Sequence, residues 1–226
     1  MKSMLKSVGY VLLVGCMGIS LYAINLFLMK PYSIDHYLAK ELALDTLDSP
    51  ETMTYVGIFD DYNFLLKHNQ KLSIGSLEKD EEDHSKNLNQ LETLQSYEPD
   101  EISSIQKVTR QIAIFDVEND INEFENFRYH SYPFNQISGN HLNMVEFMTD
   151  SHPVRSYREA SDFIARVELF DEVLGANLIW LNEQKKLGIY APRYVFDHVI
   201  KQLKELIAFS DAENPLFDVF QKKLED

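Results

Sequence analysis

Apolar residues recur at spacings of three and four along most of the chain after residue 33, and no stretch shows the strict alternation of a half-buried strand. Residues 163–181 show the pattern best. One helical face there would carry Phe163, Val167, Phe170, Leu174, Leu178 and Leu181. Hydrophobic residues make up 45% of the 226-residue chain, enough for a packed core. The pattern predicts an all-α fold, arranged as an antiparallel helical bundle.

Capping residues predict where several helices begin and end. Ser156 and Glu159 have the spacing of a capping box, and Gly188 predicts the end of the long helix that follows. Ser49 and Pro50 predict a short helix with proline at its first position. A helix after residue 101 is expected to bury the series Ile102, Ile105, Val108, Ile112 and Phe115, with Phe124 as a further candidate.

The N-terminal segment is strongly apolar. Residues 8–29 form 22 consecutive positions without a charged side chain, and about 20 such residues in a helix span a bilayer core. Lys2 and Lys6 precede the segment, which favours a cytoplasmic N-terminus. We therefore expect a membrane anchor over residues 1–30 and a helical domain over residues 31–226. The protein would be a single-pass protein of a bacterial inner membrane, with its soluble part facing the periplasm or the cell exterior.

The single cysteine offers an alternative form of anchoring. Cys16 follows Leu13, Val14 and Gly15, which is the pattern of a lipoprotein cleavage site with an acylated cysteine. Lipoproteins usually become polar soon after that cysteine, whereas residues 17–29 here stay uncharged. A membrane-spanning helix is the preferred interpretation, and either form of anchoring makes the membrane a partner.

Charge disfavours one large class of partners. The chain carries 36 acidic and 21 basic residues, and three of the basic residues precede residue 31. The part from residue 31 onward therefore has 18 basic and 36 acidic residues, a net charge of −18. Such a surface repels phosphate backbones, so we expect no nucleic-acid partner.

The histidines do not have the spacing of a helical zinc site, which needs two of them about one turn apart with a neighbouring glutamate. His130, His141 and His152 are each 11 residues apart and could be combined with Glu146. Prolines and glycines interrupt any continuous helix that would align them. We predict no metal site and no catalytic residue in this chain. His198 is expected to be a packed or edge histidine.

One loop, residues 128–139, is the best candidate for a role beyond packing. Tyr132 precedes a proline that fixes the backbone, and Asn135 and Gln136 carry amides that could bind peptide-like groups. In the alternative interpretation these amides bond the loop's own backbone. Arg193, at the start of a predicted helix, could hold a carboxylate or form a structural ion pair. These four residues are the candidates for a substrate-cleft wall.

The second half of the chain resembles the bacterial family called domain of unknown function 885. The resemblance is carried by the blocks FRYHSYPFNQISGNHL, YAPRYVFDHVIKQL and ENPLFDVFQKKL. The matching positions are Arg128, Tyr132, Pro133, Asn135, Gln136, Gly139, His152, Pro153, Pro192, Arg193, Asn214 and Pro215. Relatives tend to have a second proline where Ala191 stands.

The resemblance implies a relation to zinc peptidases of the gluzincin type. In that family the zinc-binding motif His-Glu-x-x-Pro-Gly-His lies C-terminal of the blocks found here. We therefore expect a membrane-anchored N-terminal half that is not catalytic alone, with zinc implied only for the full-length family. One alternative is half of a split zinc peptidase assembled with a separate C-terminal chain, and another is a helical periplasmic adaptor or scaffold. Self-association is also expected, because a half-fold exposes apolar surface.

Overall fold

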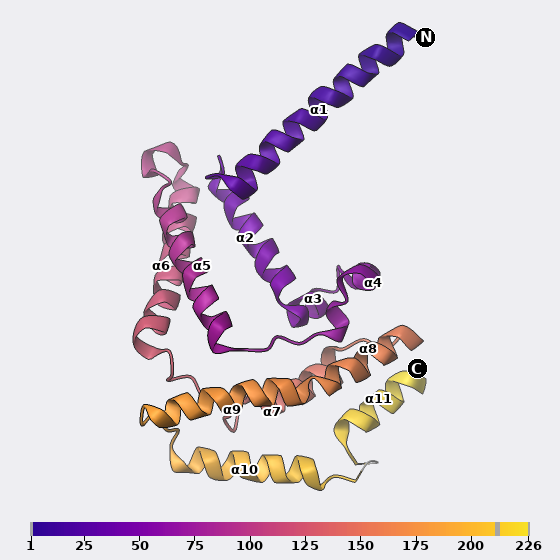
Figure 1. The fold of residues 1–226 in the computed structure, drawn as a ribbon, viewed down its shortest axis with the longest axis vertical. Coiled ribbons are helices and arrows are strands. Elements are labelled where there is room, and N and C mark those ends of the chain that lie inside the picture. Colours follow the sequence, from indigo (N-terminus) through magenta and orange to yellow (C-terminus); the bar gives the residue numbers. More distant parts are fainter. Residues whose placement is uncertain (1, 211–212, 226) are drawn as a thin grey trace. The chain divides into compact units, whose positions relative to one another are not determined.

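The computed structural model describes residues 2–210 and 213–225, except for the side chains of residues 2–8 and 11. All regular elements within these residues are helical, which confirms the predicted all-α class (Figure 1). The α-helices are α1 (Lys2–Leu28), α2 (Ile34–Asp48), α3 (Pro50–Val56), α4 (Asn63–Leu66), α5 (Leu77–Gln95), α6 (Ser104–Asn122), α7 (Asn140–Glu146), α8 (Tyr157–Glu168), α9 (Phe170–Lys186), α10 (Arg193–Ala208) and α11 (Pro215–Glu225). Two π-helical turns, Glu123–Phe127 and Phe147–Ser151, extend α6 and α7.

The chain divides into two compact units. The first comprises Met1–Asp45 and Lys86–Ile121, and the second comprises Thr46–Ser85 and Asn122–Asp226. Each unit is therefore built from two separate stretches of the sequence. The predicted division into an anchor over residues 1–30 and a helical domain over residues 31–226 stays a prediction.

The N-terminal helix α1 carries many exposed apolar side chains, among them Leu12, Leu13 and Ile19. Within the part of the chain that the structure describes, no helix is both long enough and apolar enough to cross a membrane. Lys2 and Lys6, on which the predicted orientation depends, lie outside the residues whose side chains are described.

In the first unit, α5 and α6 lie side by side and pack against the start of α2 (Figure 1). The buried centre of this packing consists of Ile34, Tyr37, Leu94, Tyr97 and Val117. Two hydrogen bonds also join these parts of the first unit. The hydroxyl of Tyr97 donates to the carbonyl oxygen of Pro31 at 2.7 Å, and Nε of Arg110 donates to the carbonyl oxygen of Leu94 at 2.8 Å.

The predicted core face of α6 is wrong. Four residues of the series that was expected to be buried are exposed: Ile105, Val108, Ile112 and Phe115 are 80%, 55%, 56% and 63% accessible. Ile102, which precedes the helix, is half-buried. A second series on the same helix, which includes Ala113, Val117 and Ile121, packs against α2 and α5 instead. Both series have helical spacing, so spacing alone could not decide which face packs.

The second unit has a core in which α7, α8, α9 and α11 meet. Its buried residues are Leu72, Phe147, Met148, Val154, Ala160, Phe163 and Val173. Ser49 and Ser156 cap α3 and α8 as expected, and Gly188 has a positive φ of 72° after the end of α9. The long helix expected from Ser156 to Gly188 is instead two helices, since α8 ends at Glu168 and α9 begins at Phe170.

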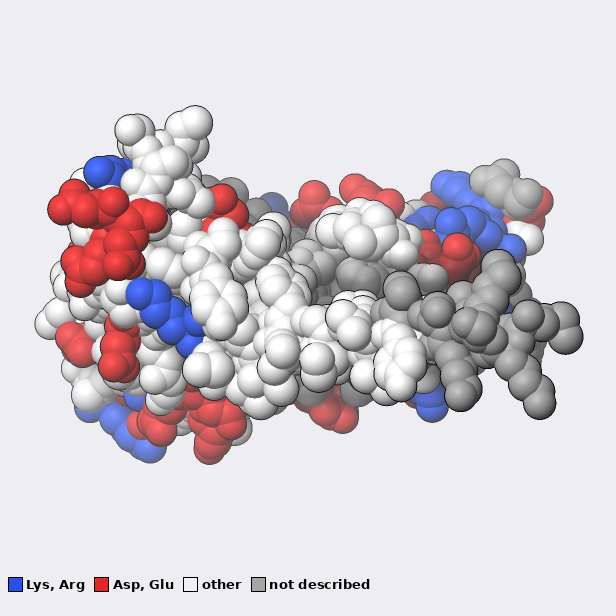
Figure 2. Space-filling view, turned by 90° about the horizontal axis from the view of Figure 1, so that it is seen from above, with Lys and Arg blue, Asp and Glu red and all other residues white. Residues whose placement is uncertain are grey.

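The surface has uneven charge. Figure 2 shows acidic and basic side chains in separate groups among uncharged surface. This distribution agrees with the excess of acidic residues in the sequence.

Candidate functional site

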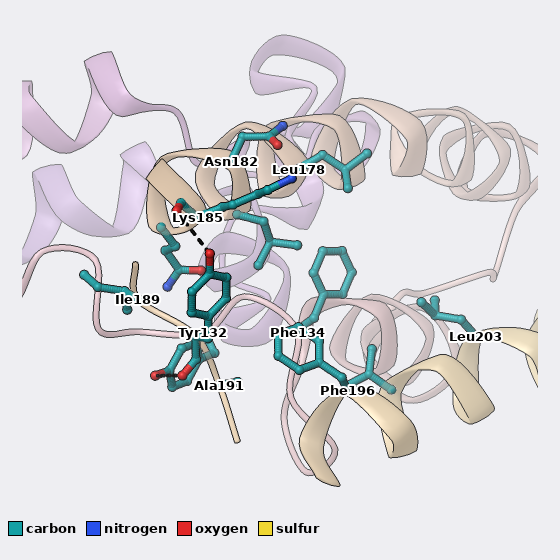
Figure 3. A pocket seen from close by; sticks show the side chains of 13 residues that line it. Tyr132, Phe134, Leu178, Asn182, Lys185, Ile189, Ala191, Phe196 and Leu203 are labelled. Atoms are coloured by element: carbon teal, nitrogen blue, oxygen red, sulfur yellow. Dashed lines mark hydrogen bonds between the residues drawn. The ribbon is translucent and has the colours of Figure 1, made fainter. Parts of the chain in front are cut away.

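A cavity of about 400 Å³ lies in the second unit, between α9, α10 and the loop of residues 131–134. Figure 3 shows Tyr132, Phe134 and Phe196 lying between these two helices, and Leu178 and Leu203 also line the cavity. This volume is within the range of small-ligand sites in proteins. The cavity is therefore large enough to accept an apolar side chain or a small apolar molecule.

The hydroxyl groups of two tyrosines in the cavity wall are already engaged. The hydroxyl of Tyr132 donates to the backbone oxygen of Tyr190 at 3.2 Å. The hydroxyl of Tyr190 donates to the backbone oxygen of Lys185 at 3.4 Å. Both polar groups bond the protein backbone, so the rings present mainly carbon to the cavity. The interior therefore favours apolar groups.

A polar groove of about 340 Å³ lies on the other side of Tyr132, which lines both spaces. In this groove the side-chain amide of Asn140 donates to Oδ1 of Asn177 at 3.0 Å. That bond fixes the amide of Asn177 so that its Nδ2 is left as a donor. Among the described residues, neither Nδ2 of Asn177 nor Nε1 of Trp180 has a hydrogen-bond partner, although both atoms are buried. Two N–H donors three residues apart on α9 thus lack an acceptor among the described residues.

Long-range hydrogen bonds hold the loop that separates the two spaces. Gln184 of α9 is buried, and its Nε2 donates to the carbonyl oxygens of Tyr129 at 2.7 Å and Ser131 at 2.8 Å. Gln202 of α10 donates to the carbonyl oxygen of Gln136 at 3.1 Å. The loop is thus fixed to both neighbouring helices, and Tyr132 has a defined position.

The amide of Asn135 bonds its own loop. Its Oδ1 accepts from the backbone N–H groups of Ile137 at 3.0 Å and Ser138 at 2.7 Å. The next turn requires glycine at position 139, because a Cβ there would lie 2.6 Å from both the backbone nitrogen and oxygen of Asn135. Asn135 therefore shapes the loop from within, which favours the alternative interpretation for this residue.

The other predicted site residues lie in different surroundings. Gln136 is half-buried, and its backbone oxygen is the acceptor for Gln202. Arg193 begins α10 and is exposed, and Cys16 is exposed on α1. Of the four predicted cleft residues, only Tyr132 lines either of the two spaces described above.

The histidines have separate partners. Nε2 of His141 lies 3.1 Å from Oε1 of Gln202, His152 contacts Arg166, and His198 bonds the backbone of its own helix. Within the described ranges, no group of three or more His, Cys, Asp or Glu side chains could hold a metal ion.

A fully buried arginine on α8 joins segments that are distant in the sequence. Arg166 has no exposed surface, and each of its guanidinium nitrogens donates at least one hydrogen bond. The acceptors are the carbonyl oxygens of Pro50 (3.2 Å), His68 (2.8 Å) and Lys71 (2.8 Å), Oγ1 of Thr54 (2.8 Å) and Nδ1 of His152 (2.9 Å). This residue fastens residues 50–71 to α8.

A buried carboxylate one turn earlier has a similar role. The two carboxylate oxygens of Asp162 accept from Nδ2 of Asn63 at 2.7 Å and Nε2 of Gln70 at 2.6 Å. Sequence reasoning missed this cluster. The available signal was the placement of Glu159, Asp162 and Arg166 at spacings of three and four, on the same face of α8 as Phe163.

The cluster changes the protonation of its members. Burial, together with the positive charge of Arg166, lowers the pKa of His152 to about 4. Burial also lowers the pKa of Arg166 itself to about 10. His152 is thus neutral at physiological pH, and its Nδ1 can accept the arginine hydrogen bond.

These features define an all-helical protein in which the loop residue Tyr132 lines both an apolar cavity and a polar groove. A family model described as bacterial protein of unknown function (DUF885) matches residues 50–226, and the chain belongs to that family. No curated protein matches the chain. The chain is similar to the crystal structure of a candidate lipoprotein from Colwellia psychrerythraea, with 18% identity and a TM-score of 0.65. The match covers 82% of this chain but 34% of that one, and at this identity it shows the fold alone.

Proposed function

We propose that this chain is the membrane-anchored, N-terminal half of a peptidase-like protein, and that it supplies a binding wall instead of a catalytic centre. The observation that carries the proposal is the position of Tyr132, between an apolar cavity and a groove with two unpartnered N–H donors. An extended peptide offers both an apolar side chain and backbone carbonyl groups, so it matches both spaces.

The chain alone is proposed to be inactive toward peptides. Hydrolysis requires an activated water or a nucleophile with a nearby base. His141 contacts Gln202 and His152 contacts Arg166, while the buried ring of His68 lies 3.7 Å from the carboxylate of Asp60 and beside no nucleophilic side chain that we assign. The zinc-binding half implied by the family resemblance would supply that chemistry.

A split enzyme is the second candidate, in which a separate chain provides the zinc-binding half. The chain spans about a third of the length of the Colwellia protein, since the match covers 34% of that protein. Exposed apolar residues on α9 and α10, such as Ile179 and Ile200, offer a surface for such a chain. Co-expression with the polypeptide encoded downstream should then produce chelator-sensitive hydrolysis that neither chain shows alone.

The N-terminal segment is proposed to hold the protein at a membrane, with the helical units outside the cytoplasm. Support comes from the 22 uncharged positions of residues 8–29 and from the exposed apolar side chains of α1. Acylation at Cys16 is the other route to the same location. After carbonate washing the chain should remain in the membrane pellet, and Cys16→Ser should release it only if the acyl group is the anchor.

The binding proposal can be tested with the chain's single tryptophan, Trp180, which lines the polar groove. Capped neutral dipeptides with an apolar side chain should change its fluorescence saturably. Tyr132→Ala should weaken this binding by about tenfold, because the wall between the two spaces is removed. Tyr157→Ala is the matched control, since Tyr157 is 93% exposed. An unchanged spectrum, or equal weakening by both variants, would exclude the proposed wall.

A further inference from the structure

The apolar cavity between α9 and α10 has two polar side chains in its wall that are not engaged. The hydroxyls of Tyr132 and Tyr190 donate to backbone oxygens, and Nε2 of Gln184 donates to two more. The other polar side chains of the wall are those of Asn182 and Lys185. Within the described part of the chain, neither of these two forms a hydrogen bond or an ion pair. The cavity wall therefore offers an amide and an ammonium group to a ligand.

Asn182 and Lys185 lie at the opening of the cavity. Both side chains line the cavity and are also exposed to solvent. Because they are three residues apart on α9, they lie on the same side of that helix, as does Leu178 of the apolar wall (Figure 3). A ligand that fills the interior with an apolar group can therefore place a polar group against these two donors.

The charge at this opening favours an anion. Among the described residues, Lys185 is the only charged one that lines the cavity. The segment that leads from α9 into α10, residues 185–193, contains the basic residues Lys185, Lys186 and Arg193 and no acidic residue, in a chain with a net charge of −15. A carboxylate can accept hydrogen bonds from an ammonium group and from an amide N–H, so it suits the two donors at the opening.

An apolar side chain and a carboxylate are found on the same α-carbon of a peptide only at its C-terminal residue. At every other apolar residue the backbone carbonyl belongs to a neutral peptide bond. A residue whose side chain enters the cavity has its α-carbon at the opening, where Asn182 and Lys185 lie. The position of these donors therefore favours the end of a peptide over its interior.

We propose that the cavity binds the C-terminal residue of a peptide, an inference that rests on the peptide-binding role proposed above. The apolar side chain of that residue fills the cavity. Its terminal carboxylate accepts hydrogen bonds from Nζ of Lys185 and Nδ2 of Asn182 at the opening. The ligand class is thus peptides with a free C-terminal carboxylate and an apolar last side chain.

The first test compares N-acetylglycylphenylalanine with its C-terminal amide, by calorimetry on the full chain in lipid nanodiscs. At neutral pH the acid should bind about fivefold more tightly, because only the acid offers a carboxylate to Lys185. Equal binding of the two probes overturns this inference and leaves the peptide-binding role intact. Absence of binding by either probe overturns both.

A substitution at the opening locates the carboxylate. Lys185→Gln should reduce binding of the acid to the level of the amide. Lys204→Gln is the matched control, because Lys204 is also exposed but lies on α10 outside the cavity lining, and it should leave the preference for the acid in place. A preference that survives Lys185→Gln, or that both substitutions reduce equally, overturns the assignment.

A second pair of probes separates a built site from general attraction of anions to the basic segment. In N-acetylphenylalanylglycine the carboxylate lies one residue beyond the apolar side chain. The acid of this sequence should bind less than about twofold more tightly than its amide, since only screened long-range attraction remains. An equal preference for the acid in both sequences overturns the proposal of a C-terminal site.

Discussion

Arg166 bonds segments of the second unit that lie far apart in the sequence. Its substitution by methionine keeps much of the side-chain volume but removes the donors that Arg166 directs at Pro50, His68 and Lys71. The carbonyl oxygen of Lys71 would lose that bond, those of Pro50 and His68 would keep only their bonds from Thr54 and from the backbone of Lys71, and the buried Asp162 would lose nearby positive charge. We expect the free energy of unfolding to fall by about 3–5 kcal/mol.

Urea unfolding monitored by circular dichroism measures this change. Arg193→Met is the control, because Arg193 is exposed, and it should shift the free energy of unfolding by less than about 0.5 kcal/mol. Equal stability of the two variants would show that the Arg166 hydrogen bonds do not hold the unit together.

His152 makes the stability of this unit dependent on pH. Its folded-state pKa of about 4 lies below the ordinary value of 6.5, so the unfolded chain binds the proton more readily. The neutral ring of His152 therefore contributes about 3 kcal/mol to the free energy of unfolding. This contribution is fully present above about pH 7 and is lost as the pH falls through 6.5 toward 4. Burial lowers the pKa of His68 as well, which adds to the same trend.

An NMR titration of the histidine rings tests this prediction directly. The ring of His152 should remain neutral at pH 5, well below the ordinary histidine pKa of 6.5. A midpoint near 6.5 for His152 would contradict the account of its burial and of its contact with Arg166.

At the residue scale, the sequence predicted helix caps better than it predicted long-range hydrogen-bond partners. Ser156 does accept from the backbone N–H of Glu159 at 3.2 Å, as a capping box requires. The carboxylate of Glu159, however, bonds Arg155 and not Ser156. A cap depends on residues three apart, which a sequence displays. The partners of Arg166 lie up to 116 residues away, and no local pattern encodes them.

The loop of residues 128–139 is the element that positions the candidate site. Gly139→Ala would place a methyl group 2.6 Å from the backbone of Asn135 and 2.8 Å from Cε1 of His141. The loop would have to move, and we expect the variant to lose about 1–3 kcal/mol of stability and to bind dipeptides more weakly.

A second glycine provides the comparison. Gly175 lies within α9, and a Cβ added there meets no atom within 4 Å. Gly175→Ala should therefore stabilise the protein by roughly 0.5–1 kcal/mol, because alanine restricts the unfolded chain. Thermal unfolding of both variants distinguishes a requirement for space at position 139 from a general effect of glycine. Stabilisation by Gly139→Ala would contradict the crowded geometry of the loop.

Among the elements, helix type was predicted well and helix faces were predicted less well. The spacing of apolar residues identified α8, α9 and α10, but it did not show the break at Leu169, where the hydrogen bonds of α8 end. In α6 two apolar series compete, and only tertiary packing selects Val117 over Ile112 for the interior. The loop could be located in the sequence from its Pro and Gly residues, whereas the cavity beside it could be found only from the folded structure.

The whole molecule has an all-helical fold, to which we assign a proposed binding wall and a proposed anchoring segment. The chain belongs to its family over residues 50–226, the structure shows the all-helical fold, and the groove beside Tyr132 supports the proposed binding role. The metal chemistry of a peptidase would then come from another polypeptide segment. This division of roles is the central claim.

Metal analysis of the purified full chain, combined with a peptide-hydrolysis assay, tests that claim most directly. The account predicts far less than one zinc ion per chain and no hydrolysis that a chelator can inhibit. One zinc ion per chain, with hydrolysis that is lost on chelation and restored by added zinc, would contradict it.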